Sequence, residues 1–196
     1  MGYYIRLLSP SEIVPEFADL RTAVATMPDV LLTLEAGDDS EWSQLLLAHD
    51  DDTAIASIER NVVQHGELGA EEIEEFLAEI EICRPAAAGE WLQEYLPRVK
   101  NIYAFQILSG TDKDEGWKAL YAVRDAIKET GGGIMQADGE GFSNEEGFHI
   151  LWQFSDSAKG PWQMAVLRDG QWESFQMELS NRTQRAAFLR GEVPGD

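Results

Sequence analysis

The chain has 196 residues, of which 44% are hydrophobic, and its 36 aspartates and glutamates face only 15 lysines and arginines, a formal net charge of −21. This apolar content is enough to fill a core and excludes global disorder, while the negative charge disfavours nucleic acid and anionic membrane surfaces as partners. The charge favours a basic protein, a basic peptide or cations instead.

The redox and targeting signals favour an intracellular location. The single cysteine, Cys83, cannot form a disulfide within the chain. The opening residues, MGYYIRLLSP, lack the long apolar segment of a signal peptide, and Arg6 replaces the Ser or Thr expected for myristoylation at Gly2. No apolar run approaches the ~20 residues needed to cross a bilayer. We therefore expect a cytoplasmic protein without a membrane partner.

In the first half of the chain, short apolar runs that are rich in strand formers alternate with turn signals. Phe17, Leu20 and Val24 recur at helical spacing, which predicts a helix. Runs of Gly, Asp and Ser at 37–40 and of Asp at 50–52 are typical of turns. The strands are expected at residues 3–8, 30–34, 45–48 and 53–58.

Two helices are expected to follow. Ile73, Phe76, Leu77 and Ile80 form one apolar stripe, and glutamates fill much of the remaining surface of this first helix. These clustered carboxylates are interpreted as a solvated face. Residues 86–89 are expected to be a linker, because Pro85 breaks the pattern, and residues 90–99 to form a short amphipathic helix.

The second half begins with a strongly apolar run at 102–108, which predicts a central strand. Asp112 and Glu115 have the spacing of a helix N-cap and its partner, before an amphipathic pattern that ends at Gly131-Gly132-Gly133. The hairpin dipeptide Asp169-Gly170 joins two predicted strands. Those strands are expected at 162–167 and 172–179, and a final helix is expected at 181–189.

The order of these elements predicts an α+β fold with largely antiparallel sheets and helices packed on one side. Residues 1–196 are expected to form one compact domain. Its halves, 1–97 and 98–196, share the order strand, helix and then three or more strands. LLSPSE follows the first strand and ILSGTD the later one, after which LEAGDDSEW and MQADGEGFS occupy corresponding places. Two related units and chance similarity both remain open.

The stretch from 131 to 154 contains the best candidate site. It reads as a strand, an acidic glycine-rich loop and a second strand at 148–154, on which Phe148, Ile150, Trp152 and Phe154 share one face. Loops on rigid scaffolds often carry function. The candidate residues for binding a ligand or partner are Asp138, Glu140, Asn144, Glu145, His149 and Trp152.

No known pattern of metal or catalytic residues fits this loop. Aligning Gly141 with the central glycine of a calcium loop places Gln136 first and Gly147 last, so both end ligands fail. The phosphate loop, the dinucleotide turn, the nucleophile elbow and the zinc-protease helix are absent from the chain. We therefore assign no catalytic residue, no metal ligand and no cofactor. Trp152, Trp162 and Trp172 are interpreted as core residues, with a binding groove as the alternative.

Two functions follow. The leading hypothesis is a non-enzymatic protein-binding module, immunity-like or chaperone-like, that engages a basic partner through its acidic surface. The alternative is an enzyme or small-ligand binder with a site at the loop 138–149, with or without the assistance of a metal ion.

Overall fold

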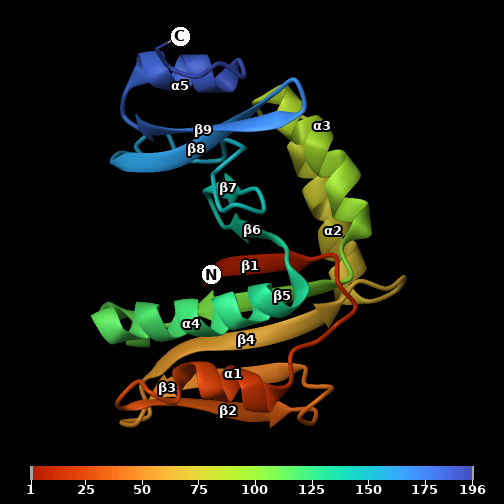
Figure 1. Cartoon of the computed structure of the whole chain (residues 1–196), viewed down its shortest axis with the longest axis vertical. Coiled ribbons are helices and arrows are strands. Elements are labelled where there is room, and N and C mark those ends of the chain that lie inside the picture. Colours follow the sequence, from red (N-terminus) through yellow and green to blue (C-terminus); the bar gives the residue numbers. More distant parts are fainter. Residues whose placement is uncertain (1, 196) are drawn as a thin grey trace. The chain divides into compact units, whose positions relative to one another are not determined.

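The computed structural model describes residues 2–195 and has the expected α+β architecture (Figure 1). The chain divides into two compact units. The first unit contains residues up to Ala70 together with Val99–Gly133, and the second contains Glu71–Arg98 together with the chain from Ile134 onward. Each unit therefore draws on both halves of the sequence. The single-domain interpretation and the repeat of 1–97 and 98–196 stay predictions.

The first unit is built on an antiparallel sheet. Its strands are β1 (Tyr3–Ser9), β2 (Val30–Ala36), β3 (Gln44–His49), β4 (Ala54–Val62) and β5 (Asn101–Ile107), in the spatial order β2-β3-β4-β5-β1. Neighbouring strands are antiparallel throughout this order. The predicted strands are confirmed. β5 lies between β4 and β1, and its first five residues are buried, so the expected central position is also confirmed.

Two helices cover one face of this sheet, α1 (Phe17–Val24) and α4 (Asp114–Gly131) (Figure 1). They contact each other, and α4 also contacts β1, β3 and β4. The apolar stripe of each helix is buried against the sheet, which is the usual source of helix stability in a globular protein.

The predicted N-cap at Asp112 is wrong. Ser109–Asp112 forms a short 3-10 helix, η2, and the residue that precedes α4 is Lys113, which makes no side-chain cap bond. A Cβ atom added to Gly116 would lie 2.3 Å from the carbonyl oxygen of Gly110. The start of α4 therefore packs closely against η2, a contact that the sequence spacing does not reveal.

The helices α2 (Leu68–Ile80) and α3 (Ala86–Tyr95) follow β4, and the 3-10 helix η1 (Leu96–Arg98) follows α3. The predicted linker at 86–89 is wrong, because these residues form the first turns of α3. Pro85 stands at the N-cap, where its fixed φ is compatible with a helix start, and alanine is the strongest helix former. Ala88 and Gly89 are buried.

The remaining strands of the second unit form two pairs. β6 (Ile134–Ala137) pairs with β7 (Gly141–Phe142), and β8 (Pro161–Arg168) pairs with β9 (Gln171–Glu178). Asp169 and Gly170 both have positive φ, as a two-residue hairpin of this kind requires. The helix α5 (Arg182–Leu189) lies across the β8–β9 hairpin (Figure 1), and Phe188 enters a core with Val166 and Met177.

The strand expected at 148–154 is wrong. This segment makes only isolated bridges at His149, one to Ser143 and one to Met164. Its later amides donate to separate places: Ile150 to the Phe142 carbonyl, Trp152 to the Arg84 carbonyl and Gln153 to the Glu140 carbonyl. His149, Ile150, Leu151 and Trp152 are all buried. A segment enclosed on all sides does not need one apolar face, so the alternation was misleading.

Within residues 2–195, none of the helices is both long enough and apolar enough to cross a bilayer.

Candidate functional site

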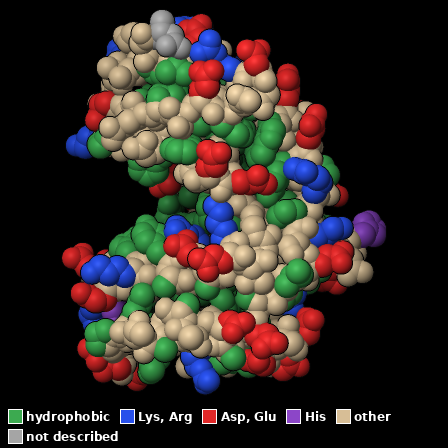
Figure 2. Space-filling model, viewed as in Figure 1, with side chains coloured by type: hydrophobic (Ala, Val, Ile, Leu, Met, Phe, Trp, Pro, Cys, Tyr) green, Lys and Arg blue, Asp and Glu red, His purple; other side chains and the backbone are tan. Residues whose placement is uncertain are grey.

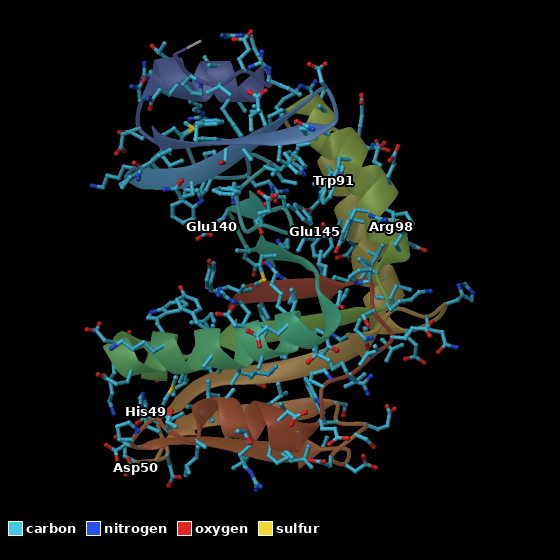
Figure 3. All side chains as sticks on the ribbon, viewed as in Figure 1. His49, Asp50, Trp91, Arg98, Glu140 and Glu145 are labelled. Atoms are coloured by element: carbon cyan, nitrogen blue, oxygen red, sulfur yellow. The ribbon has the colours of Figure 1, made fainter. Side chains whose placement is uncertain are left out.

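The six candidate residues of the loop 138–149 and its flank all lie in the second unit, but they differ in exposure. Glu145 is exposed, and Asp138 and Glu140 are half-buried. Figure 3 labels Glu140 and Glu145. The other three, Asn144, His149 and Trp152, are buried. The loop therefore presents carboxylates at its turns and packs its remaining polar groups inside.

Asp138 and Glu140 lie in the turn between β6 and β7 and not on a strand. The turn closes at Gly141, whose φ of 118° disfavours any other residue. A Cβ atom at Gly141 would also lie 2.6 Å from the Leu151 carbonyl oxygen. Both the backbone conformation and the contact require glycine here, and they fix the position of the Glu140 carbonyl.

His149 is held by backbone groups. Its Nε2 atom lies 2.8 Å from the Glu140 carbonyl oxygen, which can only accept, so Nε2 carries the proton. The ring packs 4.7 Å from Phe154 and 6.2 Å from Trp162, measured between ring centroids. Burial lowers the pKa of His149 from 6.5 to about 4, although its hydrogen bonds to the backbone of Glu140 and Leu151 act in the opposite direction. At neutral pH the ring is uncharged.

Asn144 closes the second part of the loop. Its side-chain oxygen accepts from the Phe148 backbone amide at 2.9 Å, and its backbone amide donates to the Phe148 carbonyl at 2.8 Å. The side chain is fully buried, and its Nδ2 atom has no partner within the described chain. These bonds shape the chain around Glu145-Glu146-Gly147, the exposed tip of the loop.

Replacing Asn144 with alanine is expected to lower the free energy of unfolding by about 1–3 kcal/mol, because the Phe148 amide loses its bond to the side chain. Urea denaturation followed by circular dichroism measures this change. Asn61→Ala is the matched control, since Asn61 is only half-buried and its side chain makes no hydrogen bond in the described structure. Equal losses in the two variants would contradict a structural role for Asn144.

Trp152 belongs to the core of the second unit, and Trp162 packs against the same core. The interpretation of these two residues as core residues is confirmed. The centroid of the Trp152 ring lies 5.1 Å from that of Phe154 and 6.3 Å from that of Phe188. The guanidinium of Arg185 lies 4.5 Å from the Trp152 centroid. Its Nε1 atom is buried without a partner among the described residues.

Trp172 contributes to a separate aromatic cluster with Trp91 and Tyr95. Trp91 stacks on Tyr95 with 5.0 Å between the ring centroids, and it packs edge-on against Trp172 with 5.3 Å between the centroids. The Arg98 guanidinium lies over the Tyr95 ring, 5.0 Å from its centroid. Figure 3 labels Trp91, Arg98 and Glu145. Burial raises the pKa of the Tyr95 hydroxyl, as does the nearby Glu145 carboxylate, so this tyrosine stays protonated.

Among residues 2–195, no group of three or more His, Cys, Asp and Glu side chains is placed to hold a metal ion. The three histidines do not meet: His49 is buried in the first unit against the Gly110 carbonyl, His65 is exposed, and His149 is buried in the second unit.

The chain matches no family model, no curated protein and no solved structure.

The cations around α5 were not among the predicted site residues. Lys159, Arg182 and Arg185 line one pocket of the second unit. A signal was present, because the stretch from 179 to 191 holds three arginines and no carboxylate in a chain of net charge −21.

Proposed function

We propose that this protein is a non-enzymatic binding module for a basic protein, and that α2 is its main contact surface. The observation that carries the proposal is an acidic face on α2, which consists of Glu71, Glu74, Glu75 and Glu79. All four side chains are exposed. None of them forms an ion pair with any residue in the described part of the chain.

The acidic face is opposite a buried apolar stripe. Ile73, Phe76 and Ile80 are buried, and the Phe76 ring packs edge-on against Phe142 of β7 at 5.4 Å. The helix is thus fixed in the second unit through one side, and its glutamates are held at the surface on the other. Figure 2 shows carboxylates distributed over the visible surface, so charge alone does not distinguish α2. The spacing of its glutamates distinguishes this helix.

The spacing places like charges next to each other. Glu71 and Glu75, and then Glu75 and Glu79, are four residues apart, an arrangement that costs a helix about 0.2–0.5 kcal/mol per pair. Glu79 also lies in the last turn, which has no basic residue and where the helix dipole disfavours negative charge. Solubility does not require this arrangement. A basic partner would relieve the repulsion.

Ile82 adds an apolar contact immediately after the helix, since it is 84% exposed. Protein interfaces commonly combine an apolar centre with a polar rim. The tip of the neighbouring loop, with the exposed Glu145 and Glu146, belongs to the same unit and adds two further carboxylates.

The test is a comparison of captured proteins. We expect the wild-type chain, immobilised at low salt, to retain a basic protein from extracts of its native cell. The triple variant Glu74→Gln, Glu75→Gln, Glu79→Gln should retain about tenfold less, because about 0.5 kcal/mol per lost charge pair accumulates over three sites. The bound protein is identified and quantified by mass spectrometry, and it should elute as salt is raised.

The matched control is Glu12→Gln, Glu16→Gln, Asp19→Asn, which removes three exposed carboxylates from the first unit. It should retain as much of the basic protein as the wild type. Equal loss in both triple variants would indicate non-specific ion exchange and would refute the assignment to α2. Retention of no basic protein by the wild type would count against the function itself.

The alternative, a small-ligand site or enzyme at the loop 138–149, has one observation in its favour. The buried donors Asn144 Nδ2 and Trp152 Nε1 lack a protein partner among the described residues, and buried polar groups usually have one. These N–H groups donate hydrogen bonds and cannot bind a metal ion, so they favour only the small-ligand version. A thermal-shift screen with divalent ions tests the metal-assisted version, which predicts a rise in melting temperature for at least one ion.

A further inference from the structure

We propose that the second unit holds a binding site for a small amphiphilic carboxylate, in the pocket between α5 and the loop before β8. The pocket has a volume of about 630 Å³, within the usual range of ligand sites. Its walls come from three segments: residues 156–159, the turn after β9 with Leu179 and Ser180, and one side of α5. The proposal is independent of the acidic face and of any basic partner.

The charge of the pocket is opposite to that of the chain. Its lining contains Lys159, Arg182 and Arg185 but only one carboxylate, Asp156. Lys159 and Arg182 are exposed, and neither forms an ion pair within residues 2–195. An anion approaching this chain therefore meets repulsion over most of the surface and two uncompensated cations here. The first amides of α5 add nothing, since the Asn181 side chain already accepts from them.

Arg185 is the most ordered of the three cations. Its guanidinium lies 4.5 Å from the centroid of the Trp152 ring, which is itself packed in the core. The side chain is only 27% exposed. Stacking on an aromatic face holds the planar guanidinium in position and points its edge away from the ring, which is the geometry that recognises a carboxylate.

A carboxylate already occupies this edge. Asp156 accepts from Arg185 Nη2 at 2.7 Å, although the Asp156 side chain is 93% exposed. An exposed ion pair of this kind contributes little to stability, so a ligand carboxylate that also contacts the pocket can replace it. The position of Asp156 shows that a carboxylate fits Arg185, and this is why we infer a carboxylate ligand.

The apolar part of the ligand is accounted for by the same walls. Leu179, Ala186 and Leu189 line the pocket beside the cations. The loop that forms the other wall is tied down, because the Glu178 carboxylate accepts from the Gly160 amide at 2.6 Å and from the Ser180 hydroxyl at 2.9 Å. The Gly160 bond, followed by the Ser180 bond, lowers the pKa of Glu178, so this tether remains ionised.

Isothermal titration calorimetry of the full chain with octanoate tests the site, with octanol and acetate as the neutral and short-chain comparisons. We expect octanoate to bind more tightly than either. Lys159→Gln with Arg182→Gln should weaken octanoate binding about tenfold, while Asp156→Asn should tighten it about two- to fivefold by removing the competing carboxylate. Circular dichroism checks that each variant is folded.

Lys118→Gln is the matched control, since Lys118 is an exposed cation of the first unit that forms no ion pair with a described residue, and it should leave the affinity unchanged. If octanol binds as tightly as octanoate, the site is only an apolar patch. If acetate binds as tightly as octanoate, the binding is only a diffuse charge effect. Either result overturns the proposal. So does the absence of octanoate binding. A tighter Asp156→Asn variant supports the proposal even if the double variant does not fold, because damage to the structure does not increase affinity.

Discussion

Replacing Trp42 with alanine is expected to lower the free energy of unfolding by about 3–5 kcal/mol, the range for deleting a buried aromatic side chain. Trp42 is fully buried in the first unit, where its ring lies 5.7 Å from that of Tyr103. Its Nε1 atom donates to the Pro15 carbonyl at 2.8 Å, and its own carbonyl accepts from Arg60 Nε at 2.7 Å. The residue thus joins the segment before α1 to the β-sheet.

Urea denaturation of the wild type and of Trp42→Ala measures this loss of free energy. Equal slopes of the free energy against urea concentration would show that the two unfolded states are alike. Trp42→Phe separates the two contributions: it keeps most of the ring and loses the bond to Pro15, for an expected cost of about 1–2 kcal/mol.

Trp117→Ala is the matched control for Trp42. Trp117 is only half-buried on α4, where it contacts Tyr121, itself 41% exposed. Its removal should cost less than about 2 kcal/mol, because much of the ring already faces water. A Trp42→Ala variant as stable as Trp117→Ala would contradict the assignment of Trp42 to the centre of the core.

Local sequence patterns were sufficient to predict most helices and strands. The strands of the first unit and its helix α1 follow from apolar spacing and turn residues, because each element has one buried and one solvated face. β5 was expected to be central from its continuous apolar run, and the hairpin at Asp169-Gly170 was expected from a dipeptide that tolerates positive φ.

The failures occur where contacts distant in sequence replace local rules. Residues 148–154 alternate like a strand, yet their amides donate to carbonyls as far away as Arg84. Helix α3 is a different failure: Pro85 was interpreted as the start of a linker, but a proline at the N-cap followed by alanines is compatible with a helix start. Glu140 was selected for its carboxylate, but the group that positions His149 is its backbone carbonyl, which every residue carries.

The candidate site shows the same division. Sequence placed Asn144, His149 and Trp152 in one short span but could not show that they are buried. Nor could it connect Trp152 with Arg185, 33 positions later, because that contact depends on how α5 packs across the β8–β9 hairpin. The cation-lined pocket became visible only when these segments were brought together.

Acidification should destabilise the folded chain through His149. Its pKa is about 4 when folded and about 6.5 when exposed to solvent. Above pH 6.5 the ring is neutral in both states and contributes no pH dependence. Between pH 6.5 and pH 4 the unfolded chain binds a proton that the folded chain does not bind, so stability falls as pH falls. The loss attributable to this one ring is about 3 kcal/mol across that window.

The measurement is the free energy of unfolding of the wild type and of His149→Gln, determined by urea denaturation at several pH values from 7 to 4. Carboxylates titrate in both proteins, so the difference between the two curves isolates the ring. The variant should lose less stability on acidification. The difference in free energy of unfolding between the wild type and the variant should therefore narrow progressively below pH 6.5. His65→Gln removes an exposed histidine and should parallel the wild type. If the His149→Gln curve also runs parallel to the wild type, the ring binds its proton at the same pH in the folded and unfolded chains, which would contradict the lowered pKa of the buried ring.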